Sequence, residues 1–421
     1  MRRNVLAVSY PWALTILAVL LILSDGGWAI SVQYKVLHRF DGGANGGYPN
    51  GPLLEDKAGN FYGTTSAGGG PADCGTVFEL QPPGKDGAWS LTTLYTFTCG
   101  SDGGIPINGL TADKDGNLYG TTWWGGNSDN GVIFQLTPPL RLGDTWTEAA
   151  IYDFTIPEPY PGGLAIDEQG NLYSTTEYGG GAFSGGTVFR LAPPTKAGGV
   201  WAYSLLYHFR GVPDGAFPQG GVIIGKDGDL YGTTTEGGRG RCSNGENNVG
   251  CGTIFQLRSR TGRRRWSETV LYSFRDHGDG YGPAFSLALD KKGALYGIDF
   301  FSAFKLRPPF NRGGDWVEST LYSFQGGVGG TGPYSSLIFD AAGNLYGTGD
   351  PGGIYGYGTI YELTPPRRRG RHWEKKALHT MRNPSANQPW GGVTLSKGSL
   401  YGVTRNIGSN QYGAVYEIEL R

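Results

Sequence analysis

Most of the chain consists of short stretches in which apolar and polar residues alternate, separated by turns rich in glycine, proline, asparagine and aspartate. Residues 109–154 illustrate the pattern with four such stretches: Gly109–Ala112, Leu118–Thr122, Val132–Leu136 and Trp146–Phe154. Alternation over four to eight residues predicts β-strands. The Pro138–Pro139 pair ends the third stretch, because proline cannot take part in a central strand ladder. No segment after the first thirty residues has a sustained helical period, so we expect an all-β fold.

The second stretch carries a phrase, Gly-Asn-Leu-Tyr-Gly-Thr-Thr at Gly116–Thr122, that recurs along the chain in seven versions. Its tyrosine is Tyr62, Tyr119, Tyr173, Tyr231, Tyr296, Tyr346 and Tyr401, at intervals of 50 to 65 residues. A period near 55 residues indicates a modular array. Four short strands per repeat are typical of the blade of a β-propeller. The sequence therefore predicts a seven-bladed β-propeller.

The order of the strands also predicts how the ring closes. The fourth strand of the repeat has its first copy at Tyr34–Phe40, before any complete blade, and the last repeat ends after its third strand. We therefore expect the N-terminal strand to complete blade seven, which hides the strand edges that promote aggregation.

The first thirty residues have the features of a secretory signal. Arg2 and Arg3 precede an apolar run at Trp12–Leu23, and a small-x-small cleavage pattern follows at Gly27–Ala29. Twelve apolar residues are too few to span a bilayer of about 30 Å. We expect a signal peptide at 1–29, a mature propeller at 30–421, export to the periplasm or outside the cell, and no stable membrane insertion after cleavage.

Composition narrows the functional classes. Glycine is abundant at 75 residues, but 13% of the chain is aromatic, which a disordered chain would lack. The net charge of −1 argues against nucleic acid as a partner. We expect a monomer that needs no cofactor.

The four cysteines, an even number in an exported protein, predict two disulfides. Cys74 begins strand three of blade one and Cys99 follows strand four, so the two should face each other. Cys242 and Cys251 close the longest loop. The five histidines do not cluster around these cysteines, so no metal site is predicted.

The repeat unit, written LYxF…GLxxDxxGNLYGTTxxGG…GTVFxLTPP, resembles the GloVer (Gloeo-Verruco) tandem repeats of exported bacterial proteins. The resemblance covers roughly Tyr34 to Leu420 and implies an exported repeat protein without a defined activity. The segment GLAIDEQGNLYSTT is also similar to propeller repeats of lactonase- and lyase-type enzymes, which implies a shared fold only.

Because the repeats share one packing problem, a specific function should lie where they differ. We call the face that carries the loops entering strand one and joining strands two and three the top face. Its variable positions include Trp123, Trp124, Glu177, Tyr178, Glu236 and Arg405. The incoming loops add Tyr48, Tyr160, Phe217, Tyr281, Tyr334 and Trp390. Aromatic rings at a pocket mouth can stack on sugars, with charged groups binding hydroxyls, so we expect a glycan-binding scaffold. The alternative, that these rings plug the inner ends of the blades, is favoured for the incoming-loop aromatics because they recur.

Catalysis has less support, because the chain lacks a nucleophile elbow, a paired-histidine metal motif and a phosphate-binding glycine loop. The alternative function is a lyase- or lactonase-like enzyme, with or without a divalent metal. It would use the top-face carboxylates Glu177, Glu236, Asp299 and Asp350. His277, beside Asp276 and Asp279, could act as a base or ligand, but a solvated polar loop is the favoured interpretation.

The opposite, bottom face carries an excess of arginine in the hairpins of blades four to six: Arg258, Arg260, Arg263–Arg265, Arg307, Arg312, Arg367–Arg369 and Arg371. A basic rim of this kind would attract an anionic envelope polymer, but the favoured interpretation is that these charges only solvate the rim and blunt the hairpins. A protein partner is the remaining alternative.

Overall fold

The computed structural model describes residues 32–420, apart from a set of short segments. These are residues 85–86, 142, 156–159, 181–183, 197, 244–247, 260–265, 276–279, 312, 325–331, 350–355, 369–371, 383–385 and 408–411. The expected signal peptide lies outside the described residues, as do Asp276, His277, Asp279 and Asp350. The arginines at 260, 263–265, 312, 369 and 371 lie outside them too.

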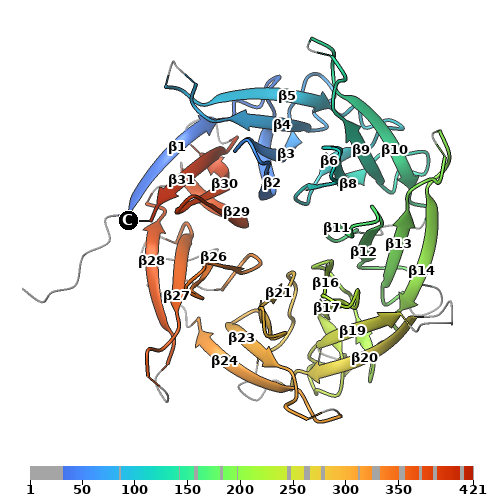
Figure 1. Cartoon of the computed structure of the whole chain (residues 1–421), viewed down its shortest axis with the longest axis vertical. Coiled ribbons are helices and arrows are strands. Elements are labelled where there is room, and N and C mark those ends of the chain that lie inside the picture. Colours follow the sequence, from blue (N-terminus) through green and yellow to red (C-terminus); the bar gives the residue numbers. More distant parts are fainter. Residues whose placement is uncertain are drawn as a thin grey trace, which may run out of the picture. The chain divides into compact units, whose positions relative to one another are not determined.

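The chain forms seven blades in a ring, each an antiparallel sheet, which confirms the expected all-β propeller (Figure 1). Blade one is β2 (Gly47–Glu55), β3 (Phe61–Ala67), β4 (Thr76–Gln81) and β5 (Ser90–Thr96). Blade two is β7 (Thr111–Ala112), β8 (Leu118–Trp124), β9 (Val132–Thr137) and β10 (Thr147–Asp153), with β6 (Gly104–Pro106) added on β8. Blade three is β11 (Ala165–Ile166), β12 (Leu172–Thr176), β13 (Thr187–Ala192) and β14 (Ala202–His208).

The remaining blades repeat this order. Blade four is β16 (Val222–Ile224), β17 (Leu230–Thr234), β19 (Thr253–Ser259) and β20 (Trp266–Ser273), beside a two-stranded sheet of β15 (Gly215–Ala216) and β18 (Glu236–Gly237). Blade five is β21 (Ala288–Leu289), β22 (Leu295–Ile298), β23 (Ser302–Arg307) and β24 (Val317–Ser323). Blade six is β25 (Ile338–Phe339), β26 (Leu345–Gly349), β27 (Thr359–Thr364) and β28 (Glu374–Thr380). Blade seven contains β29 (Ala386–Ser396), β30 (Ser399–Ile407) and β31 (Ala414–Glu419).

The N-terminal strand β1 (Gln33–Arg39) completes blade seven, as the sequence predicted. It pairs antiparallel with β31, from Gln33 opposite Glu419 to Arg39 opposite Ala414. Figure 1 shows this first strand (blue) at the outer edge of the last blade (red). The ring is therefore closed by main-chain hydrogen bonds between the two ends of the described chain.

The aspartate that precedes the recurring phrase forms a hydrogen-bonded turn with the residues of the phrase. In blade two, the Asp113 carboxylate accepts the backbone N–H groups of Asp115 and Asn117 and the side-chain amide of Asn117. It also accepts the Tyr119 hydroxyl at 2.8 Å. Asp56 makes the same set of bonds in blade one. Although burial alone would raise the pKa of Asp56, hydrogen bonds from Asn60, Tyr62 and Ala58 together lower it. In blades one, two, three, five and six, an aspartate thus ties the turn to the tyrosine of the phrase.

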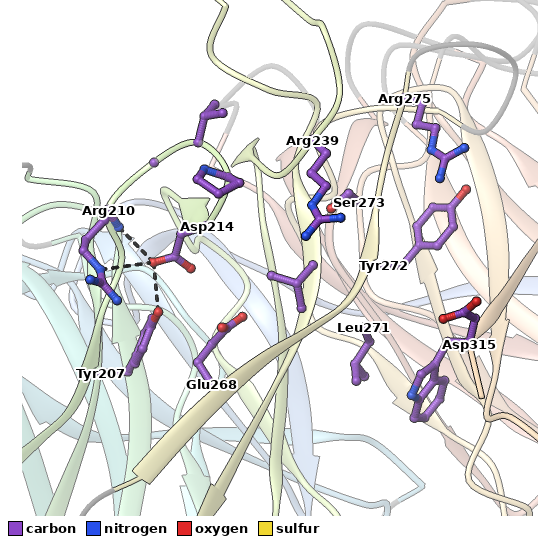
Figure 2. Close-up of a pocket in the computed structure, with 15 residues that line it drawn as sticks. Tyr207, Arg210, Asp214, Arg239, Glu268, Leu271, Tyr272, Ser273, Arg275 and Asp315 are labelled. Atoms are coloured by element: carbon purple, nitrogen blue, oxygen red, sulfur yellow. Dashed lines mark hydrogen bonds and ion pairs between the residues drawn. The ribbon is translucent and has the colours of Figure 1, made fainter. Parts of the chain in front are cut away.

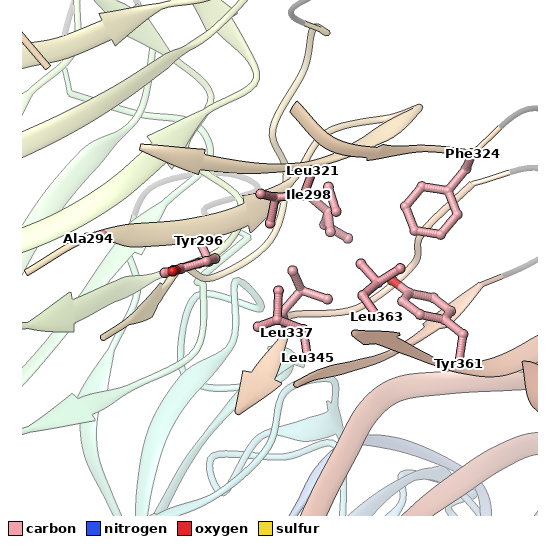
Figure 3. Packing of buried hydrophobic residues seen from close by; sticks show 10 residues of the cluster. Ala294, Tyr296, Ile298, Leu321, Phe324, Leu337, Leu345, Tyr361 and Leu363 are labelled. Carbon is pink, nitrogen blue, oxygen red and sulfur yellow. The ribbon is translucent and has the colours of Figure 1, made fainter. Parts of the chain in front are cut away.

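Tight packing explains the glycine of the phrase. In blade two a Cβ on Gly120 would overlap the ring of Phe134, which is fully buried. Between blades, apolar side chains from neighbouring sheets interlock, as Tyr296 and Leu321 of blade five do with Leu345 and Leu363 of blade six (Figure 3). Such close packing leaves little freedom for substitution.

In blades two and three, a tryptophan in the hairpin between strands three and four packs against the preceding blade. The rings of Trp146 and Tyr62 lie 6.3 Å apart in an edge-on arrangement, and those of Trp201 and Tyr119 lie 5.8 Å apart. Aromatic pairs at these distances add to the energy of burial. The tyrosine of the phrase therefore bonds to its own turn and packs against the next blade.

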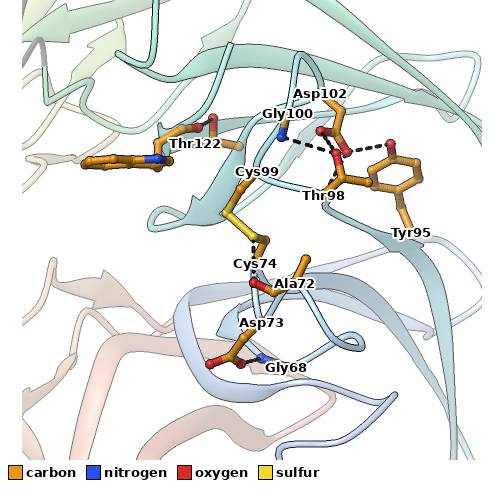
Figure 4. The surroundings of a disulfide bond; sticks show 11 residues. Gly68, Ala72, Asp73, Cys74, Tyr95, Thr98, Cys99, Gly100, Asp102 and Thr122 are labelled. Carbon is orange, nitrogen blue, oxygen red and sulfur yellow. Dashed lines mark hydrogen bonds between the residues drawn. A yellow bond between two sulfur atoms is a disulfide. The ribbon is translucent and has the colours of Figure 1, made fainter.

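The structure contains the two disulfides expected from the sequence. Cys74 and Cys99 are joined across Cα atoms 5.6 Å apart, and Cys242 and Cys251 across 5.0 Å. Figure 4 shows the first bridge beside a polar cluster in which the Asp102 carboxylate accepts the Tyr95 hydroxyl at 2.9 Å. Between Val32 and Leu420, the described residues form no helix with the length and hydrophobicity needed to cross a membrane.

Candidate functional site

A buried threonine positions the variable residues of the top face. In blades one to four, the last threonine of the phrase bonds to the carbonyl two residues further on: Thr65 to Ala67, Thr122 to Trp124, Thr176 to Tyr178 and Thr234 to Glu236. The Thr122 hydroxyl also accepts the Val132 N–H at 2.9 Å, which ties the start of the next strand to the same point. The repeated part of each unit therefore fixes the backbone of the part that varies.

This arrangement predicts a measurable role for Thr122. Replacing Thr122 with valine keeps the shape but leaves the Val132 N–H and the Trp124 carbonyl without the hydroxyl. We expect a loss of about 1 kcal/mol in the free energy of unfolding, measured by urea denaturation. Thr147→Val, at an exposed position of β10, is the matched control and should change stability by less than about 0.5 kcal/mol. Equal effects of the two substitutions would contradict this role of the Thr122 hydroxyl.

The incoming loops hold aromatic residues in a backbone conformation that L-amino acids rarely adopt. Tyr48, Tyr160 and Phe217 each precede a proline and have φ of 54°, 38° and 59°. A bulky residue at positive φ costs roughly 1–3 kcal/mol and persists only when its surroundings enforce it. Here the Phe217 N–H donates to the Gly185 carbonyl of blade three, and the Phe217 carbonyl accepts from Thr235. The backbone of Phe217 is thus held by blades three and four.

Four aromatic rings form a continuous strip across blades two to four, which we call the aromatic strip: Trp123, Tyr160, Tyr178 and Phe217. Successive ring centroids are 5.2, 5.6 and 5.3 Å apart. Trp123 is 41% exposed and Tyr178 36% exposed, and the adjacent Trp124 is 49% exposed. Trp123, Trp124 and Tyr178 therefore present apolar surface to solvent, whereas Tyr160 and Phe217 are half-buried.

The two tryptophans lie differently from the sequence-based expectation. They were expected in the loop joining strands two and three, but β8 continues through both, and Trp124 pairs with Gly104 of β6. The extra strand forms because the incoming loop of blade two runs antiparallel to the extended β8. The sheet therefore fixes the backbone of Trp123 and Trp124, whereas Tyr160, Tyr178 and Phe217 lie in loops.

A second group lies across blades six, seven and one. The Arg405 guanidinium lies over the Trp390 ring at 5.1 Å and over the Tyr48 ring at 6.0 Å. Trp390 also contacts Tyr334, with centroids 4.5 Å apart. A cation over an aromatic face is stabilised by the ring quadrupole. Trp390 and Arg405 are therefore brought together, but in a separate set of contacts from Trp123, Glu177 and Tyr178.

The top-face carboxylates lie on different blades, and each one forms contacts with its own surroundings. Glu177 of blade three accepts the Gln219 side-chain amide at 2.7 Å, and Asp299 of blade five accepts the backbone N–H groups of Phe301 and Ser302. Glu236 lies in β18, where burial raises the pKa of its carboxyl. Among the described residues, no three His, Cys, Asp or Glu side chains gather as a metal site would require.

The bottom rim is only partly free to attract anions. Of the arginines within the described residues, Arg258 contacts Asp229, with Nε 3.0 Å from the carboxylate oxygen. Arg307, Arg367 and Arg368 are the other described members. Binding of an anionic polymer at this rim stays a prediction.

Sequence reasoning identified the strip residues one by one, but not as a strip. Tyr160 and Phe217 were treated as packing residues because they recur, whereas the structure places them between the variable positions. The available signal was the aromatic-Pro pair at the start of three blades, Tyr48, Tyr160 and Phe217. Gln219, which orients Glu177, gave no signal of its own.

The comparisons with known proteins agree with this architecture. The Gloeobacter/Verrucomicrobia repeat family model matches residues 27–158, 147–301 and 304–421. No curated protein sequence matches the chain. Similar solved structures include extracellular domains of two B. thetaiotaomicron proteins assigned as hybrid two-component systems. Their TM-scores are 0.54 and 0.53, with 12% and 13% identity, covering 93% and 92% of this chain and 42% and 41% of theirs.

Another similar structure is PorZ, a surface component of the type-IX secretion system of Porphyromonas gingivalis. Its TM-score is 0.51, with 13% identity over 89% of this chain and 46% of that protein. This chain therefore spans less than half the length of each of these three proteins. At such low identities the likeness shows the fold alone.

Proposed function

This chain belongs to the Gloeobacter/Verrucomicrobia repeat family, and we propose that it is an exported scaffold that binds glycan chains along the aromatic strip. The observation that carries the proposal is the run of four contacting rings, Trp123, Tyr160, Tyr178 and Phe217, with Trp123 and Tyr178 open to solvent. Flat aromatic faces stack on the C–H faces of sugar rings, and neighbouring polar groups bind the hydroxyls.

Two further observations support the proposal. The strip is preorganised, because the Thr176 hydroxyl bonds to the Tyr178 carbonyl and blades three and four hold the Phe217 backbone. Preorganisation reduces the entropy lost when a ligand binds. The Glu177–Gln219 pair connects blades three and four beside Tyr178 and offers a carboxylate and an amide for hydroxyl groups. The two disulfides fit an oxidising, extracytoplasmic location.

The proposal is tested by calorimetric titration of the propeller, Val32–Arg421, with cellohexaose, maltohexaose and xylohexaose. We expect saturable binding of at least one of these oligosaccharides. Trp123→Ala and Trp124→Ala, combined, should weaken that binding at least about ten-fold, because the stacking surface is lost. The melting temperature should change little, since both rings are substantially exposed.

Phe310→Ala is the matched control, because Phe310 is also an exposed aromatic residue but lies in a hairpin of the bottom face. It should leave oligosaccharide binding unchanged. If none of the three oligosaccharides binds, or if the tryptophan variant binds as tightly as the parent, the strip is not a glycan site.

A further inference from the structure

Blade four carries a reinforced loop that the aromatic strip does not use. After Thr234 the chain forms β18, which pairs with β15 of the incoming loop, Gly215 opposite Gly237. The Gly238 N–H then donates to the Asp214 carbonyl, and the Cys242–Cys251 bridge closes the loop a few residues further on. Arg239 lies between these two fixed points, so its backbone is held in one place.

Arg239 borders a cavity of about 960 Å³, which we call the blade-four pocket. Its lining includes Asp214 from the incoming loop of blade four, Glu268, Tyr272 and Arg275 from blade four itself, and Trp316 from the hairpin of blade five. Figure 2 shows Tyr207, Arg210 and Asp214 on one side and Tyr272, Arg275 and Asp315 on the other, with Arg239 between them. A volume near 1,000 Å³ is at the upper end for sites that take small molecules.

The charged side chains of this pocket differ in whether they have a bonding partner. Asp214 accepts the Tyr207 hydroxyl at 2.9 Å and the Arg210 N–H at 3.2 Å, and Arg210 Nε lies 3.8 Å from its carboxylate. Within the described part of the chain, by contrast, the Arg239 guanidinium has neither a hydrogen bond nor an ion pair. A planar guanidinium of this kind suits a carboxylate, which it can bind through two parallel hydrogen bonds.

The equivalent position in blade two has a different arrangement. There Asn127 takes the place of Arg239, and Asp153 takes the place of Ser273. The Asp153 carboxylate accepts both the backbone and side-chain N–H groups of Asn127, at 2.7 and 2.6 Å. In blade two the polar groups of the loop thus hydrogen-bond to each other. In blade four the equivalent residues, Arg239 and Ser273, line an open cavity.

We propose that the blade-four pocket binds a carboxylated sugar, with Arg239 pairing with the carboxylate and Tyr272 and Trp316 lining the space for the sugar ring. Asp214, Glu268 and Asp315 in the lining oppose a doubly charged phosphate, so a single carboxylate is the better match. The pocket and the aromatic strip have no residue in common, so either site can fail without the other.

Glu268 makes binding depend on pH. Burial and the charge of Asp214 raise its pKa to about 7, against the opposing effect of Arg210. The other charged and titratable groups that line the pocket are Tyr207, Arg210, Asp214, Arg239, Tyr272, Arg275 and Asp315. Below about pH 7 Glu268 is neutral and can donate a hydrogen bond to a sugar hydroxyl. Above it, the added negative charge repels a carboxylate, so affinity falls as pH rises.

The test is a titration of the propeller with galacturonate and with trigalacturonate at pH 5.5 and pH 8. We expect saturable binding that is at least about ten-fold tighter at pH 5.5 than at pH 8. Arg239→Gln should weaken it at least ten-fold at pH 5.5. Arg241→Gln, an exposed arginine two residues along that does not line the pocket, should have no effect. Glu268→Gln should keep the affinity but remove most of its pH dependence.

Three results would overturn the proposal: equal affinity of the Arg239→Gln and parent proteins, binding of neutral galactose as tight as that of galacturonate, or tighter binding of a tri-aspartate peptide. Unchanged melting temperatures of the Arg239→Gln and Arg241→Gln variants show that any loss is local. The combined Trp123→Ala and Trp124→Ala protein should bind galacturonate normally, which separates failure here from failure of the aromatic strip.

Discussion

A chain that begins at Phe40 instead of Val32 should not form a stable monomeric propeller. Removing β1 leaves the outer edge of β31 without its partner over the whole paired length from Gln33–Glu419 to Arg39–Ala414. It also removes Tyr34, whose ring stacks on His379 of blade six at 4.0 Å. We expect a loss of more than about 5 kcal/mol in the free energy of unfolding, comparable with the whole stability of many domains.

The measurement is size-exclusion chromatography with urea denaturation of both chains under oxidising conditions. The truncated protein should elute as aggregates or as an unfolded chain, because an unpaired edge strand promotes association. A circular permutant that begins at Asp41 and carries β1 after Arg421 through a short glycine-serine linker is the control. Since Gln33 lies opposite Glu419, that linker would close an ordinary hairpin, and the permutant should fold.

The permutant separates two explanations of the loss. If ring closure by β1 is what matters, its stability should approach that of the parent protein. If the truncated chain is instead as stable as the parent, the pairing of β1 with β31 contributes nothing essential, and the ring is held by the blade boundaries alone.

The seven-bladed ring could be predicted from the sequence because the same pattern of strands recurs in every repeat. Counting the tyrosines of the phrase gives seven blades, and the strand left over at Tyr34–Phe40 has one unfilled position, next to the last strand of the chain. The Cys74–Cys99 disulfide followed from the same strand order, since these two cysteines flank antiparallel neighbours. Both inferences need only the order of strands within a blade.

The candidate site was less predictable because it depends on contacts between blades. Trp123 meets Tyr160 and Tyr178 because the incoming loop of the next blade carries Tyr160 at positive φ, which no local pattern specifies. The blade-four pocket likewise joins Asp214 to Glu268, more than fifty residues away. Spacing along the chain gives no sign that these two carboxyl groups face each other.

One position on the outer strand carries a partly buried charged residue in blades two, four and six. Glu148 of blade two, Glu268 of blade four and Lys375 of blade six each lie opposite the leucine of the third strand. Burial raises the pKa of both glutamates to about 7 and lowers that of Lys375 to about 8. Both signs of charge are thus disfavoured there, so the main cause is loss of water at the blade boundary rather than any single neighbour.

This leads to the second large effect, an increase in stability at pH 8 when Glu148→Gln and Glu268→Gln are combined. The next carboxylates, Asp102 near Glu148 and Asp214 near Glu268, add to the cost of ionising each glutamate. Glutamine has nearly the shape of the protonated acid and carries no charge. A pKa raised from 4.5 to about 7 is worth several kcal/mol if fully felt, but both side chains are partly exposed and solvent screens them. We therefore expect about 1 kcal/mol from each substitution.

The direction with pH follows from proton binding. Between pH 4.5 and about 7 the folded protein retains protons that the unfolded chain has released, so the free energy of unfolding falls as pH rises through this window. Urea denaturation at pH 5 and pH 8 should show this fall, and the double variant should lack about 2 kcal/mol of it. At pH 5 the variant and parent should be equally stable. Glu168→Gln, at an exposed turn, is the matched control and should change stability at neither pH. An equal gain at both pH values would mean that the substitutions act through packing, and that these glutamates are ionised in the folded protein throughout the range.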